Sequence, residues 1–236
     1  MPSLVLALAL AAAASPDAPL PDPFPAVSAA SYLVAVDGRE RWGRAPAAPR
    51  LPASLTKIMT ALLLLEEGWE PAAIVTVTAR AAREGGTRLG LQAAGSEAAF
   101  VARMNRRATA LGLRATRFDN PCGHDGPGQR SSARDLAALA RAALALPEFR
   151  LTVGAARVTL STRAGRSFEL PSHNPLIGRV EGVRGVKTGW TPGAGKCLVV
   201  LAERQGREVL VVLLGAPDRF WNAAGLVDLA FEQADG

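Results

Sequence analysis

The sequence predicts an α+β fold, in which strands from both ends of the chain form one antiparallel sheet and helices lie between them. Three observations predict it. A short strand, Ser31–Val36, runs into a hairpin turn at Asp37-Gly38, and several alternating apolar runs lie in the last third of the chain. The middle of the chain carries apolar residues at helical spacing. The 236 residues are 49% hydrophobic, which is enough to build one domain with a sizeable core.

The first thirty residues differ from the rest in composition. Leu4–Ala14 is an apolar Leu/Ala block followed by Ser15 and Pro16, as in the apolar core and cleavage site of a signal peptide, although no Lys or Arg precedes it. We therefore expect a signal peptide at 1–14, a Pro-rich leader at 15–30 and a single domain at 31–236. A misplaced start codon or a frayed apolar terminus are the alternatives. We expect no stable membrane anchor; membrane retention through an uncleaved Leu4–Ala14, which is short for a bilayer span, is the alternative.

The N-terminal half of the domain begins with the hairpin, whose return strand starts at Arg39–Trp42. Ser54–Glu67 carries Leu, Ile and Met at helical spacing and is followed by Gly68, which predicts a largely buried helix with a C-terminal stop. Ile74–Thr78 is a short β-branched run, and Gly85-Gly86 marks a turn.

Two further helices are expected in the middle of the chain. Ser96–Leu113 has Ser96 as a plausible N-cap and Gly112 as a stop. Ser132–Leu146 begins with a Ser-x-x-Asp sequence that resembles a capping box, and Pro147 follows its end. Between them, Asn120–Gln129 is rich in Gly and Pro and is expected to form an ordered loop.

The last third predicts strands and one closing helix. The strands are expected at Arg157–Leu160, Ser167–Leu170, Gly185–Trp190, Cys197–Glu203 and Glu208–Leu214. Asn222–Gln233 has the apolar spacing of an amphipathic helix, whose apolar face is needed against the sheet.

Composition excludes several classes of function. The net charge is +6, but the basic residues are scattered and only 5% of residues are aromatic, which argues against nucleic-acid binding. The two cysteines, Cys122 and Cys197, lack the spacing of a zinc site and could form a disulfide or remain buried thiols. His124 and His173 also lack metal-ligand spacing. We therefore expect no metal and no organic cofactor.

The lysines are the first candidates for chemistry. Of 27 basic residues only three are Lys, namely Lys57, Lys187 and Lys196, and Lys can lose its proton in a protein whereas Arg cannot. Ser54-Leu55-Thr56-Lys57 places a hydroxyl and an amine on one face at the start of a helix. A neutral Lys57 could accept the hydroxyl proton while Ser54 attacks a carbonyl. Taken alone, this spacing is a weak signal, and the preferred interpretation would be Ser54 as a helix cap and Lys57 as a solvated charge.

A second group of polar residues lies on an expected strand. Lys187-Thr188-Gly189 offers a cation, a hydroxyl and then a residue without a side chain. Such a strand can bind a carboxylate and let the backbone of a substrate approach closely. The alternative is a surface strand with an ordinary turn.

Together these segments resemble a known family. SLTKIMT (Ser54–Thr60) and GVKTGWTPGAGKCLV (Gly185–Val199) are similar to the serine D-alanyl-D-alanine carboxypeptidases, the low-molecular-mass penicillin-binding proteins. The resemblance covers nearly all of the chain after its leader. It implies the serine β-lactamase/transpeptidase fold, a central antiparallel sheet flanked by helices beside a helical lobe.

The resemblance also implies roles for residues. Ser54 would be the acylated nucleophile and Lys57 its proton acceptor. Lys187 and Thr188, followed by Gly189 and Trp190, would bind the substrate. The backbone N–H groups of Ser54 and Trp190 would form the oxyanion hole, and Arg219 is a further candidate for the substrate carboxylate or else an exposed structural Arg.

One motif of the family is missing. Relatives carry Ser-x-Asn between segments that resemble Gly85–Leu91 and Ala94–Val101, where only Gln92 and Ala93 stand here. The literal match Ser172-His173-Asn174 resembles a different segment of the family, so we interpret it as unrelated. We infer that about one helix and its flanking loop have been deleted, which shortens the helical lobe and predicts slow acylation and lower stability.

The leading hypothesis is an exported, periplasmic or otherwise extracytoplasmic, carboxypeptidase that removes the terminal D-Ala from peptidoglycan stem peptides through an acyl-enzyme on Ser54. β-Lactams are expected to bind the same site. Two alternatives remain: a non-catalytic relative that binds peptidoglycan or penicillin, and a β-lactamase or esterase on the same fold.

Overall fold

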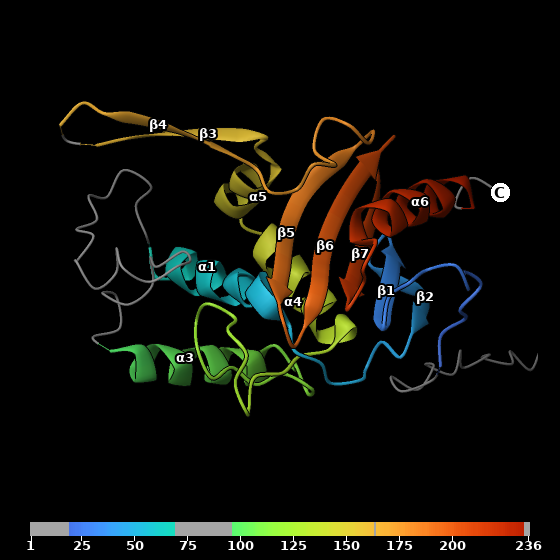
Figure 1. Ribbon diagram of the computed structural model, residues 1–236, viewed down its shortest axis with the longest axis horizontal. Helices are drawn as coiled ribbons and strands as arrows, with labels where there is room; N and C mark the ends of the chain where they lie inside the picture. Colours follow the sequence, from blue (N-terminus) through green and yellow to red (C-terminus); the bar gives the residue numbers. More distant parts are fainter. Residues whose placement is uncertain (1–18, 69–95, 163, 234–236) are drawn as a thin grey trace, which may run out of the picture.

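The computed structural model describes residues 19–68, 96–162 and 164–233 (Figure 1). At its centre lies a five-stranded antiparallel sheet with the strand order β2-β1-β7-β6-β5. Its strands are β1 (Ser31–Val36), β2 (Arg39–Arg44), β5 (Val183–Thr191), β6 (Gly195–Arg204) and β7 (Arg207–Leu214). Because β1 pairs with β7, the N-terminal hairpin joins the C-terminal strands, which confirms the predicted α+β fold.

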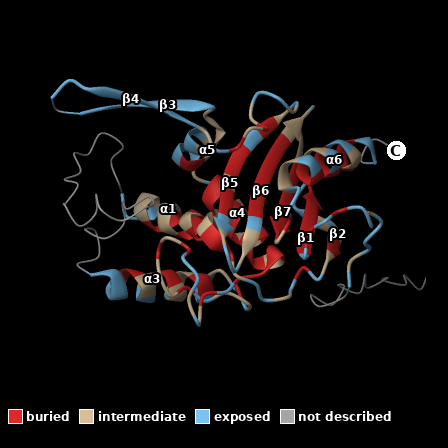
Figure 2. Cartoon of the chain, viewed as in Figure 1, coloured by how far each residue is buried: buried red, intermediate tan, exposed pale blue. Residues whose placement is uncertain are grey.

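Helices cover both faces of this sheet. They are α1 (Lys57–Glu66), α3 (Glu97–Ala110), α4 (Ala133–Leu144), α5 (Pro147–Gly154) and α6 (Arg219–Glu232), and a 3₁₀ turn, η1 (Ala53–Thr56), leads into α1. One core packs α1, α3 and α4 against the sheet, and a second core packs α6 against its other face (Figure 1). With both faces covered, the central strands are almost entirely buried (Figure 2), which explains their continuous apolar runs.

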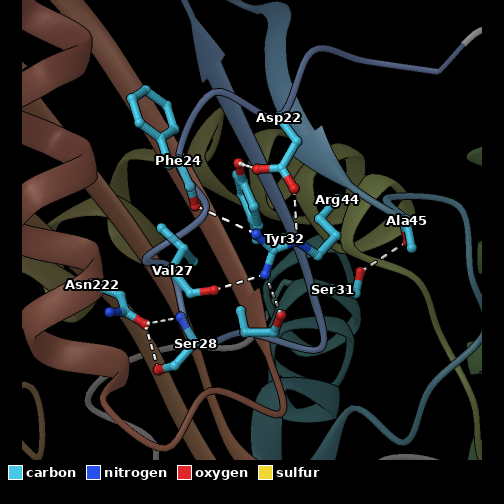
Figure 3. A network of polar contacts seen from close by, with 10 residues as sticks. Asp22, Phe24, Val27, Ser28, Ser31, Tyr32, Arg44, Ala45 and Asn222 are labelled. Carbon is cyan, nitrogen blue, oxygen red and sulfur yellow. Dashed lines mark hydrogen bonds and ion pairs between the residues drawn. The ribbon is translucent and has the colours of Figure 1, made fainter.

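The segment before β1 also packs on the domain (Figure 3). The Arg44 guanidinium forms an ion pair with Asp22 at 2.7 Å, and the hydroxyl of Tyr32 donates to the same carboxylate at 2.5 Å. The backbone N–H of Ser28 donates to the side-chain oxygen of Asn222 on α6 at 3.1 Å. Arg44 also donates to the carbonyls of Phe24, Val27 and Ala29. These contacts tie the end of the Pro-rich leader to both the sheet and α6.

A separate hairpin, β3 (Arg157–Ser161) and β4 (Ser167–Pro171), extends away from the central sheet (Figure 1). All of its residues are exposed (Figure 2). Val158 pairs with Leu170 and Leu160 with Phe168, so the alternation of the strands puts the four apolar side chains on one face.

The observed elements differ from the predicted ones in local detail. The expected helix Ser54–Glu67 begins as a 3₁₀ turn and becomes α-helical at Lys57. Pro147, expected only to follow a helix, is the first residue of α5, because proline at that position lacks an N–H that would be unpaired anyway. The expected elements at Ile74–Thr78 and Gly85-Gly86, and the deletion point at Gln92-Ala93, lie outside the described residues.

The predicted caps are present, but one of them is incomplete. The hydroxyl of Ser96 accepts from the N–H of Ala99 at 3.1 Å, and that of Ser132 accepts from the N–H of Asp135 at 3.1 Å. In a full capping box, the Asp135 carboxylate would also accept a hydrogen bond from the backbone N–H of Ser132. Instead it accepts from the N–H of Ala115 at 2.8 Å and the hydroxyl of Thr116 at 2.6 Å, so it fastens the preceding loop to α4.

Candidate active site

The Ser54–Lys57 pair lies where η1 passes into α1. The amine of Lys57 donates to the Ser54 hydroxyl at 3.0 Å, as the spacing of the two residues predicts. In a 3₁₀ turn, residues three apart eclipse one another, which brings these two side chains together. Both groups also donate to the carbonyl of Cys122, Lys57 at 2.7 Å and Ser54 at 3.4 Å. The amine therefore bridges the hydroxyl and a backbone acceptor from a distant loop.

The loop that supplies this carbonyl is fixed by its own side chains. The side-chain oxygen of Asn120 accepts from three successive N–H groups, those of Cys122, Gly123 and His124, at 2.7–3.2 Å. Thr60 of α1 donates to the carbonyl of Pro121 at 2.7 Å. The Gly- and Pro-rich segment is thus an ordered loop, as predicted, and it packs on the start of α1.

A buried hydrogen-bond chain supports the 3₁₀ turn from behind. The side-chain amide of Gln129 donates to the Thr56 hydroxyl at 2.8 Å, and that hydroxyl donates to the carbonyl of Ala53 at 2.9 Å. Gln129 and Thr56 are both buried. Because buried polar groups are costly to leave unpaired, this chain fixes the residues on either side of Ser54.

Strand β5 lies against the same turn. A Cβ placed on Gly189 would lie 3.1 Å from the backbone nitrogen of Ser54, so only glycine lets the strand approach this closely without displacing a neighbour. Lys187 and Gly189 share one face of the strand, and the amine of Lys187 donates to the carbonyl of Thr188 at 2.6 Å. The structure therefore brings the Lys187-Thr188-Gly189 segment to the Ser54–Lys57 pair.

Thr188 and Arg219 lie on the side of β5 that faces α6. Thr188 is buried and pairs with Leu198, which belongs to the core under α6. Arg219 is the first residue of α6, and its guanidinium donates to the carbonyls of Gly189 at 2.5 Å and Cys197 at 3.4 Å. Trp190, next along β5, is 61% exposed. The Thr188 hydroxyl and the Arg219 cation thus lie on the α6 side of β5, and the exposed ring of Trp190 follows Gly189 along the strand.

Burial and like charge shift the pKa values of the two site lysines. Burial lowers the pKa of Lys57 below the ordinary 10.5 of a lysine. Burial, with the positive charges of Lys57 and Arg219 nearby, lowers the pKa of Lys187 to about 8. Lys57 can therefore take up a proton from Ser54 at lower pH than a solvated lysine could.

Other candidate residues from the sequence have structural roles or stand apart. Asn174 is buried; its side-chain amide donates to the carbonyl of Gly185 at 3.1 Å, and its oxygen accepts from the N–H of Leu176 at 3.1 Å. These two bonds tie Asn174 to the backbone around it and give it a structural role. Cys122 and Cys197 are thiols and form no disulfide with each other.

Sequence reasoning missed the parts of the site that act through the backbone or from the loop. These are the Cys122 carbonyl, Asn120 and Gln129. The only signal for them was the predicted ordered loop.

Among the described residues, no three His, Cys, Asp or Glu side chains form a cluster suited to a metal ion. Within the same part of the chain, no helix has the length and apolar character that crossing a membrane requires.

Comparison with known sequences identifies the family. The model of the family described as D-alanyl-D-alanine carboxypeptidase (Peptidase_S11) matches residues 89–218. D-alanyl-D-alanine carboxypeptidase DacF of Bacillus subtilis is 32% identical over 219 residues, which cover 77% of this chain and 56% of that protein. DacB2 of Mycobacterium tuberculosis is 33% identical over 145 residues, covering 58% of this chain and 50% of that protein. The chain thus spans about half the length of these curated relatives.

Solved structures share the fold. The Streptomyces K15 DD-transpeptidase superposes with a TM-score of 0.76 at 25% identity, covering 90% of this chain and all of that one. A D-alanyl-D-alanine carboxypeptidase from Mycobacterium tuberculosis superposes with a TM-score of 0.79 at 27% identity, covering 92% of this chain and 95% of that one. From its sequence, its sheet and the residues gathered around Ser54, this chain belongs to the D-alanyl-D-alanine carboxypeptidase family.

Proposed function

We propose that this protein is a serine-type carboxypeptidase that removes the terminal D-Ala from peptidoglycan stem peptides through an acyl-enzyme on Ser54. The observation that carries the proposal is the 3.0 Å contact between the Lys57 amine and the Ser54 hydroxyl. Lys57 is a proton acceptor in reach of Ser54, and burial lowers its pKa below that of an ordinary lysine.

The reaction has two halves. The Ser54 oxygen attacks the carbonyl of the peptide bond before the terminal D-Ala, and its proton passes to neutral Lys57. The tetrahedral intermediate collapses, the C–N bond breaks, and the leaving amine of D-Ala takes a proton from the lysine. Water then hydrolyses the ester and frees Ser54. A β-lactam would acylate Ser54 in the same way, because its ring amide replaces the peptide bond.

Substrate binding is assigned to β5 and the start of α6. Lys187, Thr188 and Arg219 would hold the terminal carboxylate, because Lys187 and Thr188 precede Gly189 on β5 and Arg219 donates to the Gly189 carbonyl from the start of α6. Gly189 would let the peptide backbone approach, and Trp190 would border it. The N–H groups of Ser54 and Trp190 would stabilise the oxyanion.

We propose that catalysis is slow because the Ser-x-Asn segment has been deleted. In support, the match to DacF spans 219 residues but occupies only 77% of this 236-residue chain, so the relative has more residues in the matched region than this chain has. Loss of a proton-relaying hydroxyl or of a positioning amide costs roughly 10²–10⁴-fold each in rate.

The missing motif also favours a second function. A non-catalytic relative would keep Lys187, Thr188 and Arg219 for binding peptidoglycan or penicillin but would not release D-Ala. A β-lactamase or esterase on the same fold would instead hydrolyse its acyl-enzyme rapidly.

We place the protein outside the cytoplasm, where peptidoglycan stem peptides lie, with Leu4–Ala14 as its export signal.

The test is the mass of the intact protein after incubation with excess penicillin, beside a folded Ser54→Ala variant. A stoichiometric adduct in the unaltered protein alone supports acylation at Ser54, and release of D-Ala from a stem peptide then separates a slow enzyme from a binding protein. Rapid loss of the adduct with hydrolysed penicillin would favour a β-lactamase. The absence of an adduct on folded protein would contradict the proposed enzyme.

A further inference from the structure

Asp125 connects two parts of the structure that meet at the site. One of its carboxylate oxygens accepts from the hydroxyl of Thr191 at 2.6 Å. The other accepts from the backbone N–H of Gly193 at 2.9 Å. Asp125 belongs to the loop after α3, whereas Thr191 and Gly193 belong to the end of β5 and the turn into β6. Thr191 in turn accepts from the N–H of Ala194 at 3.0 Å, so the turn is ordered around the carboxylate.

Both parts carry groups of the proposed reaction. Three residues before Asp125 stands Cys122, whose carbonyl accepts from both Lys57 and Ser54. One residue before Thr191 stands Trp190, whose N–H is assigned to the oxyanion hole. Asp125 thus fixes the proton-accepting side of the site relative to the oxyanion side through two charge-assisted hydrogen bonds.

We propose that Asp125 is a positioning residue for acylation. It holds the loop that contacts Lys57 at a set distance from the end of β5. At that distance Ser54 can attack a carbonyl that lies in the oxyanion hole. This inference rests on the proposed function. The physical reason is geometric, since a misplacement of about 1 Å between reacting groups can cost on the order of 10²-fold in rate.

Two features separate this role from general support of the fold. Asp125 is exposed, and its hydrogen bonds lie at the surface, where their loss costs little stability. The loop also has its own internal fastening. Asp119 accepts from the N–H of Gly128 at 2.6 Å, and Asn120 binds three N–H groups, without reaching the turn after β5. Asp119 therefore offers a matched control, a carboxylate of the same loop that does not cross to β5.

The experiment measures the rate constant of penicillin acylation at saturation, the half-saturating concentration and the melting temperature for four proteins: the unaltered chain, Asp125→Ala, Asp125→Asn and Asp119→Ala. We expect Asp125→Ala to lower the acylation rate constant about tenfold, with little change in half-saturation or melting temperature. Asp125→Asn keeps an oxygen that can accept from Thr191, but its NH2 group cannot accept from the N–H of Gly193. Its acylation rate constant should therefore lie between those of the unaltered chain and Asp125→Ala. Asp119→Ala should acylate nearly as fast as the unaltered chain.

A double-mutant cycle adds a second readout. Asp125→Ala and Thr191→Val remove the same hydrogen bond, so their effects on the rate constant should be less than additive. An unaltered rate constant in Asp125→Ala, or an equal loss in Asp119→Ala, would overturn the inference while leaving acylation at Ser54 standing. A fall only in the fraction of protein that acylates would also overturn it, because that is the signature of partial unfolding. If the unaltered chain itself forms no adduct, the proposed function and this inference both fail.

Discussion

Gly123 lies directly against the backbone of Ala53, the residue before Ser54. A Cβ on Gly123 would lie 1.9 Å from the carbonyl oxygen of Ala53 and 2.9 Å from the nitrogen of Ser54, and the glycine has a φ of +85°. The loop can therefore place the Cys122 carbonyl against Lys57 only if the next residue has no side chain.

Gly123→Ala should consequently displace either the loop or the 3₁₀ turn. We expect acylation to fall by at least an order of magnitude and the free energy of unfolding to fall by well over the roughly 1–2 kcal/mol that a left-handed conformation alone costs a residue with a Cβ. Gly38→Ala is the control, because Gly38 has a φ of +78° but nothing within 4 Å of its added Cβ. Equal melting temperatures for the two variants would contradict the close packing of Gly123.

Acylation should depend on pH through both site lysines. Burial lowers the pKa of Lys57, so the fraction of neutral amine, and with it the rate, should rise with pH below the range of an ordinary lysine. The pKa of Lys187 is lowered to about 8, so its charge and its hold on a carboxylate decline above that pH. The second-order rate constant should therefore follow a bell-shaped profile with its falling limb near pH 8.

Substitution by Arg separates the two limbs, because Arg keeps its charge throughout. Lys187→Arg should move the falling limb to higher pH, although its longer side chain will weaken binding. Lys57→Arg should abolish acylation at every pH. A profile that rises to a plateau beyond pH 9 in the unaltered protein would show that the charge of Lys187 is dispensable.

The buried charge of Lys187 should also cost stability. Its folded-state pKa of about 8 lies below that of the unfolded chain, so below pH 8 the folded state carries a charge that its surroundings disfavour. Lys187→Met should raise the free energy of unfolding at pH 7 by roughly 1–3 kcal/mol. Between pH 8 and 10.5 the folded chain binds fewer protons than the unfolded chain, so the unaltered protein gains stability and this difference should shrink. Denaturant unfolding at pH 7 and pH 10 measures the free energy of unfolding of the unaltered protein and of Lys187→Met. The same difference between the two proteins at both pH values would contradict the shifted pKa of Lys187.

The sequence predicted the sheet and the contact between Ser54 and Lys57 because both rest on local spacing. Short apolar runs bounded by turn residues mark the strands, and the Ser54–Lys57 spacing of three residues brings the two side chains together in either an α or a 3₁₀ turn. The Cys122 carbonyl was not predictable in this way, because a backbone acceptor has no residue type to mark it and its partner is 65 residues away. For Asp135, a long-range bond to Thr116 replaced the expected local one to Ser132.

Substitutions in the triplet Ser172-His173-Asn174 test whether it serves as the Ser-x-Asn motif of the family. Asn174 makes two buried hydrogen bonds, to Gly185 and Leu176, whereas Ser172 accepts only from the N–H of Asn174 at 3.2 Å and His173 is exposed. Asn174→Ala should therefore lower the free energy of unfolding by about 2–3 kcal/mol, since it leaves a buried carbonyl and a buried N–H unpaired. Ser172→Ala should cost less than about 1 kcal/mol, and His173→Ala should be neutral within about 0.5 kcal/mol.

The rate of penicillin acylation distinguishes this structural role from a catalytic one. If the triplet only supports the fold, folded protein of all three variants should acylate at the unaltered rate. If it served as the proton-relaying motif, Ser172→Ala would lower the rate by roughly 10²-fold or more while leaving the melting temperature unchanged. The hydrogen bonds of Asn174 point to the first result, because they bind it to the backbone on both sides and leave neither its oxygen nor its amide directed at Ser54.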